Sequence, residues 1–339
     1  MDLRSDTVTK PTPEMREAMA RAIVGNAAWG EDPTVNELER RSAEVLGKEA
    51  AMFVPSGTMG NQTALRVWTS RKVAPEVICH ERAHIVMNEA AGLAALCHAQ
   101  AKTLPGKGGC MPLDSIRVAI QPRANPVKPQ TAVIALENTH NWENGAVLPL
   151  EYMRDVHALA QEHKLPVHLD GARIFNAATA LGRPAREIAQ HADSIQFCFS
   201  KGLAAPIGSM LVGPKDFIED ASKVRQYIGG ALRQAGVIAA AALIGLDTMT
   251  KRLHEDHANC KRLAIGLKGL PLKFEPPQTN ILIMDSIERP AKEIIDACAN
   301  QGVLFSLISP HEFRAVTHND VTTADIDRAI DVLRAVLGT

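Results

Sequence analysis

The sequence predicts an α/β protein with a mostly parallel, mixed sheet, helices on both faces and a smaller C-terminal α/β domain. Short apolar segments alternate with helical stretches from residue 50 to about residue 215, the pattern that builds such a sheet. An alanine-rich stretch at 235–248 and a helix at 251–267 then lead to a second group of strands and helices. We therefore expect an N-terminal arm and a large domain over residues 1–250, and a small domain over residues 251–339.

The first 47 residues are expected to form an extended arm and two helices. Thr12-Pro13-Glu14 has the sequence of a helix start, because threonine caps the first turn and proline is tolerated at its first position. A turn-rich stretch at 29–33 precedes a second helix over residues 35–46, which Gly47 ends. The first strand of the sheet is therefore expected just beyond this glycine.

The expected strands are short apolar segments bounded by turn residues. In the large domain they are Ala51–Val54, Val77–Cys79, Thr131–Leu136, Val167–Leu169, Ile195–Phe199 and Ser209–Val212. In the small domain they are Asn280–Met284, Val303–Leu307 and Arg314–Thr317, with helices near Ala291–Gln301 and Thr323–Leu337. The glycines at 106–109 and the prolines at 122–129 indicate two loops.

The overall composition favours small-molecule chemistry. The net charge is −1 and no basic block occurs, so nothing attracts the chain to nucleic acid or to an anionic membrane surface. Six cysteines lack paired Cys-x-x-Cys spacing, as is typical of reduced thiols. The polar N-terminus does not resemble a signal peptide and no apolar run reaches membrane-spanning length, so we expect a cytoplasmic protein.

A lysine and an acid follow two of the expected strands. Asp170 closes the apolar segment 165–169, and Lys201 follows the strand at 195–199 after Ser200. The carboxyl ends of strands in an α/β sheet are where ligands bind, so these groups are expected to share a cleft. Pyridoxal phosphate (PLP) is the cofactor that needs both, because its aldehyde forms a Schiff base with lysine and its ring nitrogen needs an acid.

The third requirement of PLP, a phosphate cradle, matches the segment from Ser56 to Asn61. Gly57 lets the backbone approach an anion, Thr58 adds a hydroxyl, and a helix expected over residues 62–70 offers free N–H groups. Taken alone, the segment is better explained as an ordinary strand-to-helix turn, Asp170 as a helix cap and Arg173 as a surface ion pair. The combination of cradle, acid and lysine is what favours the cofactor site.

Seven segments carry a resemblance that spans nearly the whole chain. They are Leu3–Thr9, Gly30–Val35, Gly57–Asn61, Glu137–Asn141, Asp170–Asn176, Ser200–Gly202 and Arg314–His318. In these segments the chain resembles the low-specificity L-threonine aldolases, PLP-dependent lyases of the aspartate aminotransferase (fold type I) superfamily. The resemblance implies cleavage of L-threonine or L-allo-threonine to glycine and acetaldehyde.

The resemblance also implies roles for individual residues. Lys201 would carry the Schiff base, Asp170 would pair with the ring nitrogen, and His84 would stack on the ring and help to remove the β-hydroxyl proton. The cofactor-binding set would be Gly57, Thr58, His84, Asp170, Arg173, Ser200, Lys201 and Arg233. Ser5, Arg173 and Arg314 would bind the substrate carboxylate. Because Arg233 would reach the phosphate from a neighbouring subunit, the resemblance implies a homo-oligomer, a dimer of dimers.

Two positions depart from the family pattern. Some relatives have a lysine where this chain has Gln226, and a histidine near the position of Val127-Lys128. The first difference would reduce positive charge near the phosphate. The second bears on how the β-hydroxyl is recognised and leaves the preference between threonine and allo-threonine open.

Other functions compete with this interpretation. His80-Glu81-Arg82-Ala83-His84 is a literal H-E-x-x-H, which on a helix would bind zinc and indicate a hydrolase. The motif follows a strand, however, so its first two residues are expected in a loop. A phenylserine-type aldolase and another β-eliminating PLP lyase also remain open. A noncatalytic PLP-binding module is disfavoured, because Ser5, His84, Arg173 and Arg314 would add a substrate site to the cofactor site.

Overall fold

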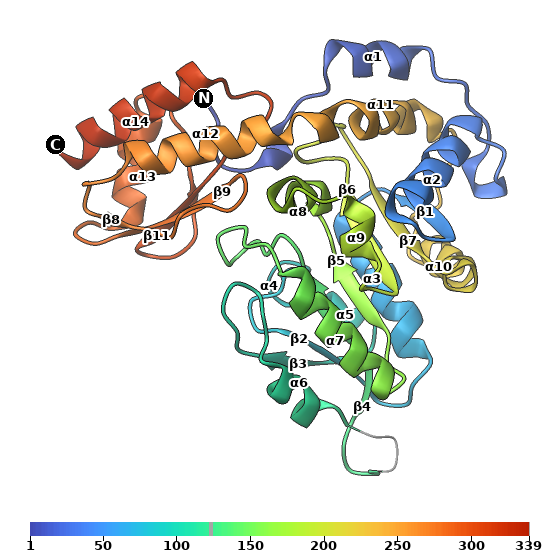
Figure 1. Ribbon diagram of the computed structural model, residues 1–339. Helices are drawn as coiled ribbons and strands as arrows, with labels where there is room; N and C mark the ends of the chain where they lie inside the picture. Colours follow the sequence, from blue (N-terminus) through green and yellow to red (C-terminus); the bar gives the residue numbers. More distant parts are fainter. Residues whose placement is uncertain (122–124, 339) are drawn as a thin grey trace.

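The computed structural model describes residues 1–121 and 125–338, so part of the loop predicted at 122–129 lies outside the described residues. The chain forms two units, each with its own sheet and core (Figure 1). The large unit contains a seven-stranded sheet and helices α1 to α11, and the small unit contains a four-stranded sheet and helices α12 to α14. The division of the chain at residue 250 remains a prediction.

The sheet of the large unit is mixed, with the strand order β1-β7-β6-β5-β4-β2-β3. Only β7 runs antiparallel to its neighbours β1 and β6; the other described pairs are parallel. The strands are β1 Ala50–Val54, β2 Pro75–His80, β3 Gln100–Leu104, β4 Gln130–Glu137, β5 Val167–Asp170, β6 Ser194–Cys198 and β7 Ser209–Gly213. The six predicted strands are therefore confirmed, and the mixed α/β fold class with them.

The strand β3 was not predicted, because its sequence is polar. Three of its five side chains are exposed, and it lies at the edge of the sheet beside β2. The central strands are instead buried on both faces, so they read as continuous apolar runs. Ile78 packs into one core of the large unit while its neighbours Val77 and Cys79 pack into the other.

Helices cover both faces of this sheet. Helices α3 and α10 pack on one face, and α2, α7, α8 and α9 lie on the other (Figure 1). The helices of the large unit are α1 Pro13–Ala20, α2 Pro33–Leu46, α3 Gly57–Ser70, α4 His84–Met87, α5 Gly92–Ala95, α6 Leu113–Ala119, α7 Leu150–Glu162, α8 Ile174–Leu181, α9 Ala185–Ala189, α10 Lys215–Tyr227 and α11 Gly236–Asp247. Short 3-10 turns lie at Asp6–Val8, Ala27–Trp29 and Met249–Lys251.

The residues predicted to begin and end the first two helices do so in the structure. The Thr12 side chain accepts from the N–H of Met15 and so caps α1, and Pro13 occupies its first position. Helix α2 ends at Gly47, whose φ of 63° is the left-handed conformation that glycine adopts without strain. Helix α3 begins at Gly57, five residues before the predicted start, so the predicted phosphate cradle is the first turn of the helix itself.

The small unit is an antiparallel sheet covered by helices. Its strands are β8 Leu272–Lys273, β9 Ile281–Ser286, β10 Ser306–Leu307 and β11 Glu312–Val316, in the order β10-β11-β9-β8. Its helices are α12 Leu253–Gly266, α13 Ala291–Ala299 and α14 Thr323–Leu337. The strand predicted over residues 303–307 is shorter than expected, because Leu304 pairs with the N-terminal arm instead of with the sheet.

The N-terminal arm joins the small unit. Leu3 is fully buried in the core of the small unit, and its backbone bonds to Leu304 and Val316 at 2.9 and 2.8 Å. Three residues later, Asp6 is buried against Arg173 of the large unit. The arm therefore connects the two units within a few residues.

Three further findings bear on the sequence predictions. The glycine-rich segment at 106–109 forms a turn closed by an isolated bridge between Lys107 and Cys110, as predicted. All six cysteines are free. Within residues 1–121 and 125–338, no helix combines the length and apolar character that a membrane crossing requires.

Candidate active site

Six of the predicted site residues line one cavity of about 140 Å³ beyond the carboxyl ends of β5 and β6. These residues are Gly57, Thr58, His84, Asp170, Ser200 and Lys201, and Asn61, Ala172, Gln196 and Cys198 complete the wall. The strand order explains the meeting, because β5 and β6 are parallel neighbours and deliver Asp170 and Lys201 to the same edge. The sequence prediction that these residues share a cleft is therefore confirmed.

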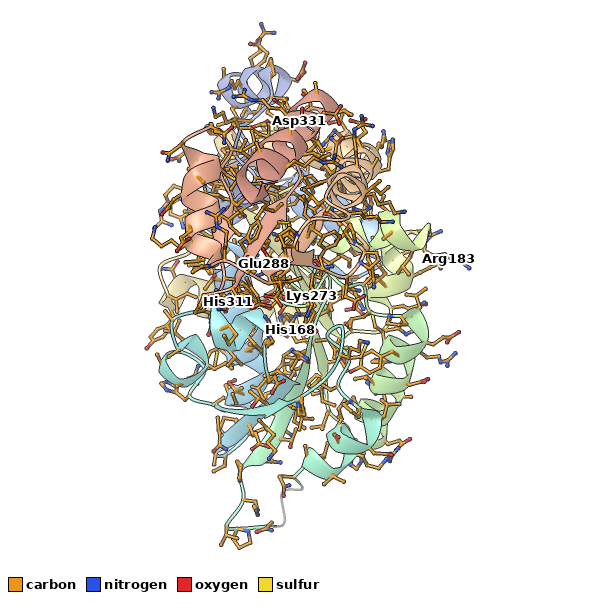
Figure 2. The ribbon with its side chains drawn as sticks, turned by 90° about the vertical axis from the view of Figure 1, so that its left-hand side faces the viewer. His168, Arg183, Lys273, Glu288, His311 and Asp331 are labelled. Carbon is orange, nitrogen blue, oxygen red and sulfur yellow. The ribbon has the colours of Figure 1, made fainter. Side chains whose placement is uncertain are left out.

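Asp170 is held by hydrogen bonds on both carboxylate oxygens. The Asn61 side chain donates to Oδ2 at 2.7 Å, and the N–H of Ala172 donates to Oδ1 at 3.1 Å. The other end of the Asn61 amide lies 3.1 Å from Nε2 of His168, which is fully buried in the interior (Figure 2). Burial lowers the pKa of His168 to about 4 despite the nearby Asp170 charge, so His168 is a neutral support for the amide.

His84 begins helix α4 and is oriented by Glu89. Its Nδ1 lies 2.8 Å from Oε1 of Glu89, a buried carboxylate that also accepts from Asn61 at 2.8 Å and from Gln62 at 2.5 Å. A hydrogen bond from Nδ1 to a carboxylate leaves Nε2 of His84 as the proton acceptor. Burial alone would lower the pKa of His84, but the Glu89 hydrogen bond and the Asp170 charge outweigh it and raise this pKa.

The phosphate cradle depends on two glycines. A Cβ at Gly57 would lie 2.8 Å from Sγ of Cys198, and a Cβ at Gly60 would lie 2.5 Å from Cγ of Gln196, so larger residues would clash. The amide oxygen of Gln196 is buried without a hydrogen-bond partner at this wall. The cavity thus combines an amine, a fixed carboxylate and the N-terminus of a 14-residue helix, which is the donor set that PLP requires.

The two predicted carboxylate-binding arginines differ in their partners. Arg173 is buried and donates to Asp6 from Nε and from Nη2, at 2.6 and 2.8 Å. Burial would raise the pKa of Asp6, but the Arg173 charge outweighs it and holds this pKa well below its usual range. Arg173 is not among the residues that line the cavity, and its charge is already matched by Asp6. Its role in substrate binding stays a prediction.

Arg314, on β11, has no acidic partner among residues 1–121 and 125–338. Its Nη1 donates to Oδ1 of Asn141 at 2.9 Å, its Cζ lies 5.5 Å from the centre of the Trp142 ring, and its buried Nε is unpartnered. Burial and the charge of Arg173 lower the pKa of Arg314 to about 10. A half-buried guanidinium without a counter-charge is suited to bind an anion.

The remaining predicted positions do not line the cavity. Ser5 accepts from the N–H and hydroxyl of Thr7 at 3.2 and 2.9 Å and so caps the turn that contains Asp6. Arg233 is exposed, and its nearest hydrogen bond is to the carbonyl of Ala231 at 3.5 Å. Gln226 is also exposed, in the last turn of α10. The contribution of Arg233 across a subunit boundary remains a prediction.

The H-E-x-x-H segment does not form a helical zinc motif. His80 is the last residue of β2 rather than part of a loop, Glu81 lies in a turn, and only His84 begins a helix. The His80 ring packs edge-on against His140 at 4.6 Å between centroids. Among the described residues, the group of His, Asp and Glu side chains that converges is His84, Glu89 and Asp170, at the cavity described above. The zinc-hydrolase alternative through His80, Glu81 and His84 therefore lacks its geometry.

Several functional residues carried no role in the sequence prediction. Glu89 orients His84, Asn61 bridges Glu89 and Asp170, and Asp6 neutralises Arg173. Glu137, at the end of β4, accepts from the backbone N–H of His84 and of Asn141. Burial and the neighbouring Asp170 raise the pKa of Glu137 to about 7. All of these except Glu89 lie inside the motif segments, so their positions, though not their partners, could have been found.

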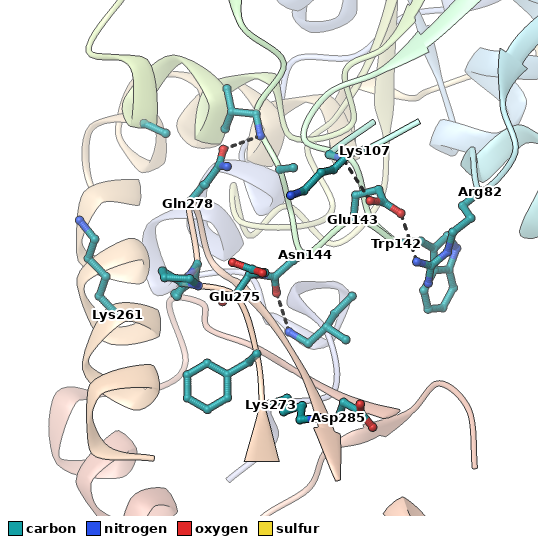
Figure 3. Close-up of a pocket in the computed structure, with 18 of the residues that line it drawn as sticks. Arg82, Lys107, Trp142, Glu143, Asn144, Lys261, Lys273, Glu275, Gln278 and Asp285 are labelled. Carbon is teal, nitrogen blue, oxygen red and sulfur yellow. Dashed lines mark hydrogen bonds and ion pairs between the residues drawn. The ribbon is translucent and has the colours of Figure 1, made fainter. Parts of the chain in front are cut away.

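A larger cleft of about 1070 Å³ opens between the two units (Figure 3). It is lined by Trp142, Glu143 and Asn144 on one side and by residues around β8 and β9 on the other. None of the residues predicted for the site lines the described part of this cleft. The candidate active site is therefore the smaller cavity, where the ionisable groups converge.

The mixed sheet, the small C-terminal unit and the convergent lysine and aspartate define the fold type I class of α/β enzymes. The chain belongs to the beta-eliminating lyase family, whose model matches residues 2–289. It is 40% identical over 347 residues to low-specificity L-threonine aldolase 1 of Arabidopsis thaliana, covering 100% of this chain and 97% of that protein. The family resemblance is therefore confirmed.

Solved structures show the same fold. Threonine aldolase of Leishmania major superposes with a TM-score of 0.86 at 19% identity and covers 99% of both chains. A structure of SPT with PLP superposes with a TM-score of 0.76 at 19% identity, covering 99% of this chain and 87% of that one. The fold class expected from the sequence is confirmed by both.

Proposed function

We propose that this chain is a PLP-dependent aldolase that cleaves L-threonine and L-allo-threonine to glycine and acetaldehyde. The observation that carries the proposal is the His84–Glu89 pair, which places a proton acceptor in the same cavity as Asp170 and Lys201. The identity to a low-specificity L-threonine aldolase over the whole chain supports this substrate class. A base beside a PLP site is what distinguishes cleavage of a β-hydroxy amino acid from simple cofactor binding.

The residues of the cavity fit PLP. Lys201 would hold the aldehyde, Asp170 would hold the proton of the ring nitrogen, and the first turn of α3 with Gly57 and Thr58 would hold the phosphate. Ser200 would add a hydroxyl at the same wall. When bound, PLP supplies an electron-poor ring that accepts the electron pair of the broken Cα–Cβ bond.

His84 is assigned the proton transfer. Glu89 fixes the tautomer of His84, so Nε2 accepts the proton of the substrate β-hydroxyl as the aldehyde forms. Because a protonated imidazole cannot act as base, the raised pKa of His84 moves the onset of activity toward higher pH. The rate is therefore expected to rise with pH as His84 loses its proton.

Arg314 is assigned the substrate carboxylate. Its guanidinium lacks an acid partner among the described residues and can donate two parallel hydrogen bonds. Arg173 and Ser5 would complete this end of the site, Arg173 through the buried pair with Asp6. Two fixed ends orient the amino acid, which removes rotational freedom before the bond breaks.

The test is an assay of the purified protein with L-threonine, L-allo-threonine and L-phenylserine, with and without added PLP. Formation of glycine and acetaldehyde in equal amounts, dependent on PLP, is expected. Release of ammonia and a keto acid instead would identify a β-eliminating lyase, and preference for phenylserine would identify the other alternative. Retention of activity after metal chelation is the further control against a zinc enzyme.

We also infer a homo-oligomer, a dimer of dimers with active sites at the subunit interface, in the cytoplasm. Several large apolar side chains are exposed, with Trp29 at 75% and Tyr227 at 82%, and Arg233 is free to reach a neighbouring chain. The six free cysteines suit a reducing compartment.

Light scattering tests the assembly, and weaker PLP binding by an Arg233→Ala variant tests the shared site. A monomer with full PLP affinity would refute both.

A further inference from the structure

The segment from Glu137 to Trp142 contacts both functional ends of the site. Glu137 is buried, yet it forms no ion pair with an arginine or lysine in the described chain. Its Oε2 accepts from the backbone N–H of His84 at 2.6 Å, and its Oε1 accepts from that of Asn141 at 2.7 Å. A buried carboxylate that binds only backbone donors is costly to desolvate, and the two N–H groups that Glu137 holds point to a positioning role.

The other end of the segment, at Asn141 and Trp142, also contacts both the helix of His84 and the side chain of Arg314. Trp142 donates from Nε1 to Oδ1 of Asn88 at 2.6 Å, and Asn88 directly follows helix α4, which begins at His84. The same ring lies under the guanidinium of Arg314, and Asn141 accepts a hydrogen bond from Arg314 at 2.9 Å. Two contacts thus attach the segment to the helix of the base, and two attach it to the arginine of the small unit.

We propose that residues 137–142 are a positioning element. This segment fixes His84 and Arg314 at the distance that the hydroxyl and carboxylate ends of a β-hydroxy amino acid require. The inference rests on the proposed function, in which these two side chains take the hydroxyl and carboxylate ends of the substrate. Glu137 accepts from the backbone of His84 and of Asn141 and so contacts both ends. Trp142 contacts the helix of the base by donating to Asn88, and Asn141 contacts the arginine by accepting from Arg314. The three side chains are therefore expected to differ in which kinetic constant they control.

The test compares variants of the PLP-loaded enzyme by the kcat for L-threonine and by the Kd for glycine, measured from the cofactor absorbance. Glycine has the carboxylate but no hydroxyl, so its Kd reports the arginine end alone. Asn141→Ala is expected to raise the glycine Kd about tenfold with little change in kcat. Trp142→Phe keeps a ring under Arg314 but loses the bond to Asn88, so kcat falls about fivefold and the glycine Kd is unchanged.

Glu137→Gln is expected to change both constants by about tenfold, because an amide cannot accept from two N–H groups with both of its ends. The matched control is Asn144→Gly. Asn144 also joins this loop to the small unit, accepting from the N–H of Ile283 at 2.6 Å (Figure 3), and it forms no hydrogen bond or ion pair with His84 or Arg314 among the described residues. Its φ of 57° is tolerated by glycine, so both constants should stay within about twofold.

The proposal is overturned if Asn144→Gly reproduces the losses, which would mean that the loop only docks the two units. It is also overturned if Asn141→Ala and Trp142→Phe change the same constant, or if neither changes any constant. These two variants keep the test decisive should Glu137→Gln fail to fold. Failure of the proposed function is distinct, because the unaltered enzyme would then bind glycine or PLP without cleaving L-threonine.

Discussion

Arg173 and Arg314 belong to the same predicted substrate site but have opposite electrostatic surroundings. Arg173 comes from the large unit and is buried in a two-bond ion pair with Asp6. Arg314 comes from the small unit, touches an amide and an aromatic ring, and keeps an unpartnered Nε. The comparison teaches that one guanidinium stabilises the architecture of the site while the other is free to receive a ligand.

The largest loss of activity is expected from Lys201→Ala, and the effects of the variants at both arginines can be compared with this loss. Lys201 supplies the amine of the cavity, so turnover of L-threonine should fall by at least about 10⁴-fold. Its side chain forms no hydrogen bond within the described residues, so the urea midpoint of the apoenzyme should not change. Appreciable activity in the purified variant, measured by acetaldehyde release, would refute the assignment.

Arg173→Ala tests the architectural half of the comparison. Removing the guanidinium leaves Asp6 charged and buried, so the free energy of unfolding should fall by about 3–5 kcal/mol. Arg314→Ala should cost less, about 1–2 kcal/mol, because it breaks the bond to Asn141, a long bond to the Arg4 carbonyl and the contact with the Trp142 ring, and leaves no buried charge unpaired. Urea unfolding of the two apoenzymes gives the comparison directly.

A double variant, Asp6→Asn with Arg173→Met, serves as the control for this measurement. It should recover part of the lost stability, since no buried charge is left unpaired. Equal destabilisation by Arg173→Ala and Arg314→Ala would contradict the distinction between the two arginines.

Arg314→Lys tests the ligand-binding half. Lysine keeps the charge but cannot form the two parallel bonds of a guanidinium, so the KM for L-threonine should rise about 10- to 100-fold. The apoenzyme should unfold as the unaltered protein does. An unchanged KM would assign the carboxylate to another group, and Arg173 would be the first to examine.

The smallest effect is expected from Glu89→Gln, which acts on the base and should spare both arginines. The carboxylate of Glu89 helps to raise the pKa of His84, so its loss lowers that pKa. Since the base must be unprotonated, the acid limb of the kcat/KM profile should move to lower pH, while the plateau falls about tenfold. A limb that stays in place would show that His84 is not the group that titrates.

Much of the site followed from the sequence because it is encoded locally. Asp170 and Lys201 each sit just beyond an apolar strand, so their convergence needs only the parallel order of β5 and β6. The cradle at Gly57 is likewise a strand followed by a helix. These features therefore do not depend on how distant segments of the chain pack against one another.

The remaining features depend on contacts between distant segments. Asp6 and Arg173 are 167 residues apart, and no local pattern marks them as a pair. Glu89 follows an exposed asparagine in a segment without periodicity, and it is buried where Asn61 and Gln62 of α3 donate to it. The edge strand β3 was missed for the complementary reason, because its exposed side chains remove the apolar signal.

The short span from Leu3 to Asp6 constrains how the protein can open. Leu3 is anchored in the core of the small unit, and Asp6 is anchored on Arg173 in the large unit. A rigid-body hinge that swung the two units apart would have to pull out one anchor or the other. Amino acids are therefore expected to enter and leave through side-chain and loop rearrangement at the mouth of the cavity, with the two units moving together as one body.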